Sequence, residues 1–309
     1  MLPPAKLSNL CTSVHAKRPL GIGIALVIYI CLGSSSLPAD AGNFRHSEIA
    51  AAVADLQSND LDLKRNAAKK VAKMGVEGKE AIPALIAAMS DSDPGVKEQV
   101  AIALDAMGPD AKDAAPVLIE FLQNKTYDSI RGRAAMALGD IGPAAASISV
   151  PALITVLDDP ESGVASSAVR ALADIGPSAK AALPDLVALM ATENVALRNT
   201  ACFAILQIGV QDDNLNLVLP MLSDEIDSVR SCAARTIANS QCEASSAIPV
   251  LLKLVDDPQA YVRVDAYNAL KRLAPNKKVT VPGVAMLKDY GQESNALWYN
   301  DWTILNNSK

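Results

Sequence analysis

Few residues in this chain could perform chemistry. A nucleophilic serine or cysteine needs a histidine to accept its proton, and of two histidines only His46 lies beyond the first 41 residues. The sequence contains no Cys-x-x-Cys-His, no His-Glu-x-x-His, no P-loop and no cysteine–histidine cluster with zinc spacing. The motif inventory therefore predicts a protein that is not an enzyme and has no cofactor or metal.

Carboxylates do occur in pairs, as in Asp91/Asp93 and Asp158/Asp159. Calcium requires six to eight oxygen ligands, which is more than such short turns offer. The acidic residues instead recur along the chain at a constant spacing from a set of basic residues that recur in the same way. The acidic positions are Asp91, Asp159, Asp224 and Asp257, and the basic positions are Lys64, Lys97, Arg131, Arg198, Arg230 and Arg263.

This register belongs to a repeat that fills most of the chain. Its unit begins with an apolar residue, which a basic residue follows. Ala lies four positions after the first residue of the unit, an aliphatic residue eight positions after it and Gly twelve positions after it. Copies begin at Leu63, Val96, Ile130, Val164, Leu197, Val229 and Val262, with steps of 33, 34, 34, 33, 32 and 33 residues. Such a period is typical of a solenoid, in which each repeat buries its apolar face against its neighbours.

Each unit predicts a helix whose buried stripe, in the third copy, contains Ile130, Ala134, Ala137, Leu138 and Ile141. Gly75, Gly108, Gly142, Gly176 and Gly209 are expected to end five of these helices in the left-handed conformation. A shorter apolar helix precedes each unit, with Pro in its first turn. In the sixth repeat Asn216 replaces this Pro and Pro220 follows, so we expect a kink or a late start.

The run of basic residue, Ala-Ala, Ala-Leu and Ile-Gly resembles the short HEAT-like repeats, particularly those of phycobilisome lyases. The resemblance covers roughly residues 47 to 278 and implies a right-handed, all-α solenoid of about seven two-helix repeats. It also implies that the acidic and basic columns form a structural ladder between neighbouring repeats, and that the second helices line a concave face.

Positions that point away from the buried stripe are the candidates for partner binding. Ile102, Met136 and Phe203 are apolar where water is expected, and charged residues surround them. Such a surface suits a protein or peptide, although soluble proteins also tolerate isolated exposed apolar residues. The candidate set is Ile102, Arg133, Met136, Arg170, Phe203 and Arg235.

Residues 1–41 are interpreted as a signal peptide. Lys6, Lys17 and Arg18 precede the apolar run 20–32, and Ala39-Asp40-Ala41 fits an A-x-A cleavage site. The run is short for a membrane span, so we expect export to the periplasm or the exterior of a bacterium, without a membrane span in the mature chain. An uncleaved anchor is the alternative. The other divisions are a solenoid over 42–278 and a cap or tail over 279–309.

The mature chain would carry three cysteines, Cys202, Cys232 and Cys242. An odd number implies no disulfide framework. Cys202 and Cys232 fall inside predicted helices, where free cysteine usually packs as a small hydrophobic residue. A Cys232–Cys242 bridge is the alternative in an oxidising compartment.

Charge argues against nucleic acid as a partner. The full chain has 28 basic and 34 acidic residues, and removing residues 1–41 leaves 25 minus 33, or −8. Covering phosphates requires a basic stripe, and both tryptophans lie in the C-terminal tail with Tyr290 and Tyr299. The tail is interpreted as a cap on the last repeat, with docking to a partner or membrane as the alternative.

Three functions remain open at this stage. The favoured one is an exported, non-enzymatic scaffold that presents its concave face to another protein or a peptide. The resemblance also suggests a lyase or accessory factor of the phycobilin-lyase type, which absorbance of a bound bilin would reveal. A HEAT-like DNA glycosylase is disfavoured by the acidic charge.

Overall fold

The computed structural model describes residues 40–126 and 128–275. The chain divides into two units, Met1–Ser47 and Glu48–Lys309, and the description below concerns the second. The predicted signal peptide lies outside the described residues up to residue 39, as does the aromatic tail after residue 275.

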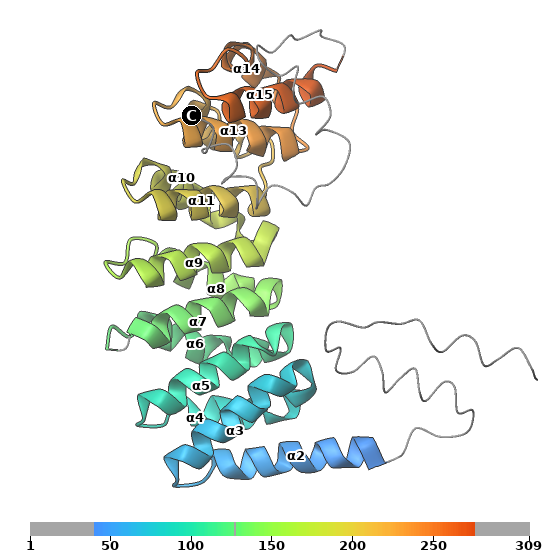
Figure 1. The fold of residues 1–309 in the computed structure, drawn as a ribbon, viewed down its shortest axis with the longest axis vertical. Coiled ribbons are helices and arrows are strands. Elements are labelled where there is room, and N and C mark those ends of the chain that lie inside the picture. The colour runs from blue at the N-terminus through green and yellow to red at the C-terminus, as the bar shows by residue number, and fades with distance from the viewer. Residues whose placement is uncertain (1–39, 127, 276–309) are drawn as a thin grey trace, which may run out of the picture. The chain divides into compact units, whose positions relative to one another are not determined.

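The described part of the chain is helical and contains no strand. Seven second helices carry the repeated unit: α3 (Leu61–Met74), α5 (Pro94–Asp105), α7 (Asp128–Ile141), α9 (Ser162–Ile175), α11 (Val195–Ile208), α13 (Asp227–Asn239) and α15 (Ala260–Leu273). The first helices are α2 (Asp40–Leu56), α4 (Ile82–Ala88), α6 (Ala115–Gln123), α8 (Ala146–Ile154), α10 (Leu183–Ala188), α12 (Leu215–Val218) and α14 (Ile248–Leu254). From α3 onward, the second helices stack in chain order along one side (Figure 1). The predicted all-α solenoid is confirmed.

The predicted register places the core correctly. Leu104, Leu138 and Leu172, the aliphatic residues eight positions after three unit starts, are fully buried. Gly75, Gly108, Gly142, Gly176 and Gly209 all have positive φ, between 54° and 76°, as predicted for residues that end helices. Four of them open 3₁₀ segments: η2 (Gly75–Ala81), η3 (Gly108–Ala114), η4 (Gly142–Ala145) and η5 (Gly176–Ala182).

Proline marks the start of most first helices, with two departures. Pro83, Pro116, Pro184 and Pro249 lie in the first turns of α4, α6, α10 and α14. In the fourth repeat η4 is short, so α8 begins early and Pro151 lies inside it instead of in its first turn. In the sixth repeat α12 spans only Leu215–Val218, and Pro220 begins a separate 3₁₀ segment, η7 (Pro220–Ser223). The break expected there is confirmed.

Ile130–Ile154 is the one described stretch apolar and long enough to span a membrane by composition. It comprises α7, η4 and α8, which meet at the positive-φ Gly142. Since 61% of its most apolar window is buried inside the solenoid, we assign this stretch to the core of the stack.

A glycine inside α7 brings two second helices close together. A Cβ on Gly139 would lie 2.7 Å from Cα and 2.9 Å from Cβ of Ala171 in α9. Gly139→Ala is therefore expected to lower the free energy of unfolding by about 1–3 kcal/mol through overpacking, although alanine favours helix by about 1 kcal/mol. Chemical denaturation measures the difference.

Gly163→Ala is the matched control, because Gly163 lies in α9 and a Cβ added there would meet no neighbouring atom within 4 Å. It is expected to leave stability unchanged or raise it slightly. Equal effects of the two substitutions would contradict the close approach of α7 and α9.

A disulfide joins Cys202 in α11 to Cys232 in α13. Their Cα atoms are 5.8 Å apart, a separation typical of disulfides. The interpretation of these two residues as free hydrophobic cysteines was therefore wrong, as was the alternative of a Cys232–Cys242 bridge. Cys242 is buried and free, and its thiol donates a hydrogen bond to the Val210 carbonyl oxygen at 3.1 Å.

Candidate partner-binding face

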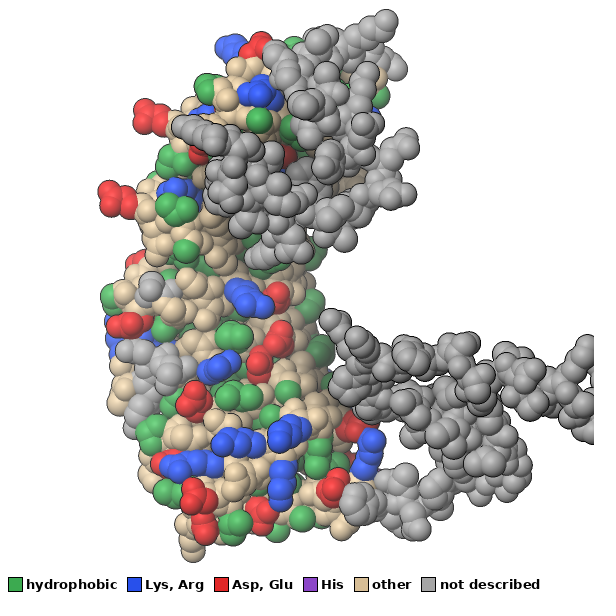
Figure 2. Space-filling model, viewed as in Figure 1, with side chains coloured by type: hydrophobic (Ala, Val, Ile, Leu, Met, Phe, Trp, Pro, Cys, Tyr) green, Lys and Arg blue, Asp and Glu red, His purple; other side chains and the backbone are tan. Residues whose placement is uncertain are grey.

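The second-helix face is the surface formed by the outward sides of the second helices, and it faces the viewer in Figures 1 and 2. Phe203 of α11 is an exposed large apolar residue near the middle of that helix, with 39% of its surface accessible. Ile102 of α5 and Met136 of α7 are only half-buried. These two apolar residues are therefore less exposed to solvent than the sequence predicted.

Met136 and Arg133 line a shallow pocket of about 330 Å³ between α7 and α9. The opposite wall comes from Gly163, Val164 and Ser167 of α9. Because Gly163 has no side chain, the pocket stays open beside Met136. A small apolar side chain of a partner could enter it.

Two arginines, Arg170 and Arg235, lie on the second-helix face in repeats C-terminal to Met136. Arg170 of α9 is exposed and separates Met136 from Phe203 along the stack. Arg235 of α13 is half-buried, and its Nη2 lies 3.8 Å from Sγ of Cys202. The Cys202–Cys232 disulfide therefore lies next to the Arg235 side chain, and Cys202 immediately precedes Phe203 in the sequence.

Three aspartates lie on the same face of consecutive second helices: Asp105 of α5, Asp140 of α7 and Asp174 of α9. Burial, a hydrogen bond with Asp140 and the charge of Asp140 raise the pKa of Asp105 to about 7, against the opposing charges of Arg133 and Arg170. Burial, followed by the charge of Asp140, also raises the pKa of Asp174. The middle of the face thus combines two carboxyl groups of raised pKa with two arginines.

The acidic ladder residues lie in the turns that precede the second helices, and the basic ones lie near the starts of those helices. Lys64 Nζ donates to Asp91 Oδ2 at 2.5 Å, and the Arg131 guanidinium pairs with Asp159 in the next repeat. Arg230 Nε donates to Asp257 Oδ2 at 2.8 Å.

The side-chain hydrogen bonds to these acids are the leading cause that lowers the pKa of Asp91 and of Asp159. The arrangement connects neighbouring repeats and engages the carboxylates of Asp91, Asp159 and Asp257. Among the described residues no group of three or more metal-ligating side chains comes together.

Other ladder positions are used differently. Arg198 Nη1 donates to the Thr192 carbonyl oxygen at 2.6 Å, and Arg263 Nη1 donates to the Asp257 carbonyl oxygen at 2.8 Å, so each binds the turn before its own helix. Asp224 Oδ1 accepts from the backbone N–H of Ile226 at 2.9 Å. Lys97 Nζ lies 5.0 Å from the centre of the Phe121 ring. The ladder therefore mixes ion pairs between repeats with contacts within them.

A buried carboxyl group links the last two second helices. Ser231 Oγ of α13 donates to Asp265 Oδ2 of α15 at 2.5 Å. Burial raises the pKa of Asp265 to about 7, opposed by the Ser231 hydrogen bond and the charge of Arg235. The folded chain therefore holds this proton more tightly than the unfolded chain, where the pKa is near 3.8.

Protonated Asp265 contributes its full stabilisation to the folded state below pH 3.8. This contribution is lost as the pH rises through about 7. Asp265→Asn is thus expected to be more stable than the wild type at pH 8, by roughly 1–3 kcal/mol, because asparagine carries no charge to bury. Urea unfolding of both proteins at pH 4.5 and pH 8 checks the difference, which should shrink at the lower pH. A pH-independent difference would contradict the protonated state.

Comparison with known proteins adds a family match. The model of HEAT repeats matches residues 49–139, 115–206 and 183–271, which together span most of the described chain. A search of curated proteins found no match.

Solved structures show similar repeat architectures. An archaeal HEAT-like repeat protein from Thermococcus onnurineus is 12% identical with a TM-score of 0.49, covering 78% of this chain and 98% of that one. The complex of CpcE and CpcF of phycocyanin lyase from Nostoc is 25% identical with a TM-score of 0.45, covering 73% and 94%. A designed armadillo repeat protein in complex with a (KR)4 peptide is 18% identical with a TM-score of 0.47, covering 73% and 99%.

Proposed function

Because the chain belongs to the HEAT-repeat family, we propose that it is an exported, non-enzymatic scaffold whose second-helix face binds another protein or a peptide. The observation that carries the proposal is the exposed Phe203. It lies on the same face as Arg170 and the pocket beside Met136. Binding energy in protein interfaces concentrates in aromatic and arginine side chains of this kind.

The charges on the second-helix face suit a partner that carries both acidic and basic groups. Arg133 and Arg170 can pair with carboxylates of a partner, whereas the exposed Asp140 and Asp174 can accept from its basic groups. Apolar contact with Phe203 and the pocket beside Met136 would supply most of the affinity. The partner is therefore expected to present apolar side chains flanked by charges of both signs.

The experiment compares three proteins in a pull-down from cells that export the chain. The variant Phe203→Ser/Arg170→Glu changes the second-helix face, and Ile148→Ser changes an apolar residue of α8 with a similar exposed fraction of 45%. The wild type and the Ile148 variant should recover the same partner, which the face variant should lose. A partner retained by a folded face variant would contradict the proposal.

Export is the second part of the proposal. The Cys202–Cys232 disulfide supports it, because disulfides persist in oxidising compartments and are rare in the cytosol of most organisms. Protein taken from its native compartment is expected to lack residues 1–41 by mass spectrometry. Cys202 and Cys232 should resist alkylation until a reductant is added. Both cysteines alkylated without reductant would contradict export.

The third part of the proposal is that the protein catalyses no reaction. The perturbed carboxyl groups Asp105 and Asp265 have neighbours that account for their pKa values, so neither requires a catalytic role. Purified protein is expected to carry no bilin absorbance and to bind none when bilin is added. Stoichiometric uptake of bilin would favour the lyase alternative instead.

A further inference from the structure

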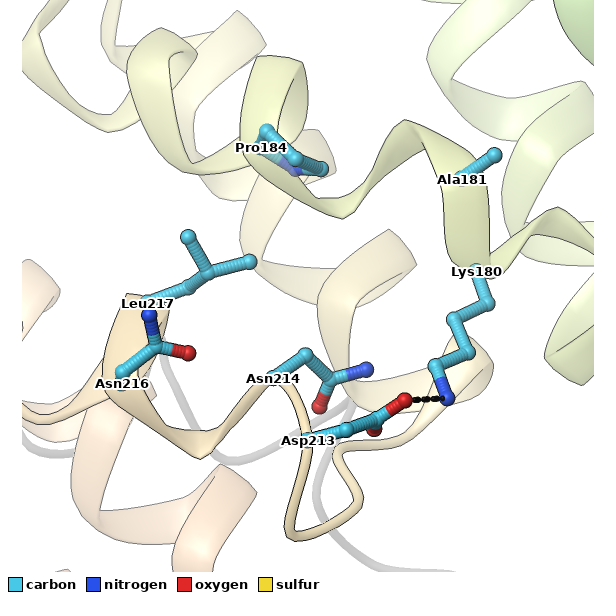
Figure 3. A pocket seen from close by; sticks show the side chains of 7 residues that line it. All are labelled: Lys180, Ala181, Pro184, Asp213, Asn214, Asn216 and Leu217. Atoms are coloured by element: carbon cyan, nitrogen blue, oxygen red, sulfur yellow. Dashed lines mark hydrogen bonds and ion pairs between the residues drawn. The ribbon is translucent and has the colours of Figure 1, made fainter.

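A second pocket, of about 480 Å³, opens between the fifth and sixth repeats (Figure 3). Lys180 of η5 and Pro184 of α10 line one side, and Asp213, Asn214 and Leu217 line the other. None of its lining residues belongs to a second helix. The pocket lies where the regular first helix is replaced by the short α12 and the loop before it.

Asn214 is the residue that points to a ligand. Its side chain is buried, with 8% of the residue exposed, and its Oδ1 accepts from the backbone N–H of Gln211 at 2.8 Å. Its Nδ2 has no hydrogen-bond acceptor among the described residues, and it points toward the Lys180–Asp213 side of the pocket in Figure 3. A buried donor without an acceptor costs about 1–3 kcal/mol, so an acceptor supplied by a ligand would stabilise it.

Lys180 provides a second donor beside Asn214. Its Nζ donates to Asp213 Oδ2 at 2.5 Å and to Gln211 Oε1 at 3.1 Å. An ammonium group has three N–H donors, so these contacts leave one for a further acceptor. Asp213 already balances the charge of Lys180, and Asp212 adds another negative charge in the same loop. The pocket therefore favours an uncharged acceptor over an anion.

An ion pair alone would not indicate a site, because a similar pair occurs elsewhere in the stack. Lys79 of η2 holds the position of Lys180 in the second repeat, and its Nζ lies 3.9 Å from Asp110 of the next repeat. The Lys79 pair connects η2 to η3. What distinguishes the fifth and sixth repeats is the combination of the pocket, the buried amide of Asn214 and the apolar wall formed by Pro184 and Leu217.

We propose that this pocket binds a short peptide segment of a partner through an uncharged main-chain carbonyl. The carbonyl oxygen accepts from Asn214 Nδ2 and Lys180 Nζ, and an adjacent aliphatic side chain packs on Pro184 and Leu217. This site is separate from the second-helix face and does not depend on the function proposed for it.

The test uses N-acetyl-leucine methylamide as the probe and the full chain labelled with nitrogen-15. A saturable shift of the Asn214 side-chain amide resonance is expected in NMR spectra. The matched probe N-acetyl-leucine replaces the terminal amide with a carboxylate, and it should bind at least about tenfold more weakly, because the pocket has no net positive charge. No saturable shift with the methylamide, or tighter binding of the carboxylate probe, would overturn the proposal.

Two variants test the donors separately. Asn214→Asp keeps an oxygen that can accept from Gln211 N–H but removes the free amide donors, and it should abolish binding. Lys180→Met should weaken it at least about tenfold. Lys112→Met is the matched control for the lysine, since Lys112 holds the same position of its own repeat in η3 and lines neither pocket. Unchanged probe binding by folded Lys180→Met protein would contradict the assignment even if the Asn214 variant failed to fold.

Discussion

Replacing Leu138 with alanine is expected to lower the free energy of unfolding by about 2–5 kcal/mol. Leu138 is fully buried in the C-terminal half of α7, within the core shared by neighbouring repeats. Truncation removes three side-chain carbons and leaves a cavity that a packed interior refills only in part. Chemical denaturation of the two proteins measures the loss.

Met136→Ala is the matched control in the same helix. Met136 is half-buried at the edge of an open pocket, so its truncation should cost clearly less than that of Leu138. A cost under about 1 kcal/mol for Leu138→Ala would contradict the register of the repeats.

Removal of the Cys202–Cys232 disulfide is expected to have a similarly large effect. The two cysteines are separated by 30 residues in sequence, and opening a loop of that length destabilises a folded chain by about 3–4 kcal/mol in the chain-entropy model. The double variant Cys202→Ser/Cys232→Ser should therefore unfold at lower denaturant concentration than the oxidised wild type.

Reduction provides the control for this prediction. Wild-type protein with a reductant should approach the stability of the double variant, whereas the reductant should leave the variant itself unchanged. Cys242→Ser in the oxidised protein should keep the disulfide intact. Equal stability of oxidised wild type and the double variant would contradict a bridge between α11 and α13.

The period of the repeat predicted most of the fold because burial in a solenoid depends on local register. Ile130, Leu138 and Ile141 fall on one side of a helix by spacing alone, and all three are buried. Gly142 and its equivalents could be placed because a residue that ends a helix with positive φ favours glycine. These features require no knowledge of how neighbouring helices are rotated.

Contacts between repeats were less accessible from the sequence. The disulfide depends on where Cys202 and Cys232 point on two adjacent helices, and the two residues occupy different positions of the repeated unit. Asp105 lies one residue earlier in its repeated unit than Asp140 does in the next unit. The contact between the two carboxyl groups was therefore not predicted from the sequence. The equivalents of Asp105 in the next two repeats are Gly139 and Ala173.

The candidate face was predicted in outline, while the exposure of its residues was not. Phe203 reaches solvent, whereas Met136 partly packs at the edge of a pocket whose other wall is α9. Sequence periodicity indicates the direction of a side chain from its own helix, but neighbouring helices decide how much of it water can reach.

The most direct measurement is site-specific photo-crosslinking on the second-helix face. A photoreactive phenylalanine analogue at position 203 is compared with the same analogue at position 148 of α8, since both positions are exposed. We predict that a partner crosslinks at 203 and not at 148, and that the purified partner then binds wild-type protein but not Phe203→Ser/Arg170→Glu. Crosslinking at 148 alone, or equal binding of the purified partner to the face variant, would contradict a scaffold that works through its second helices.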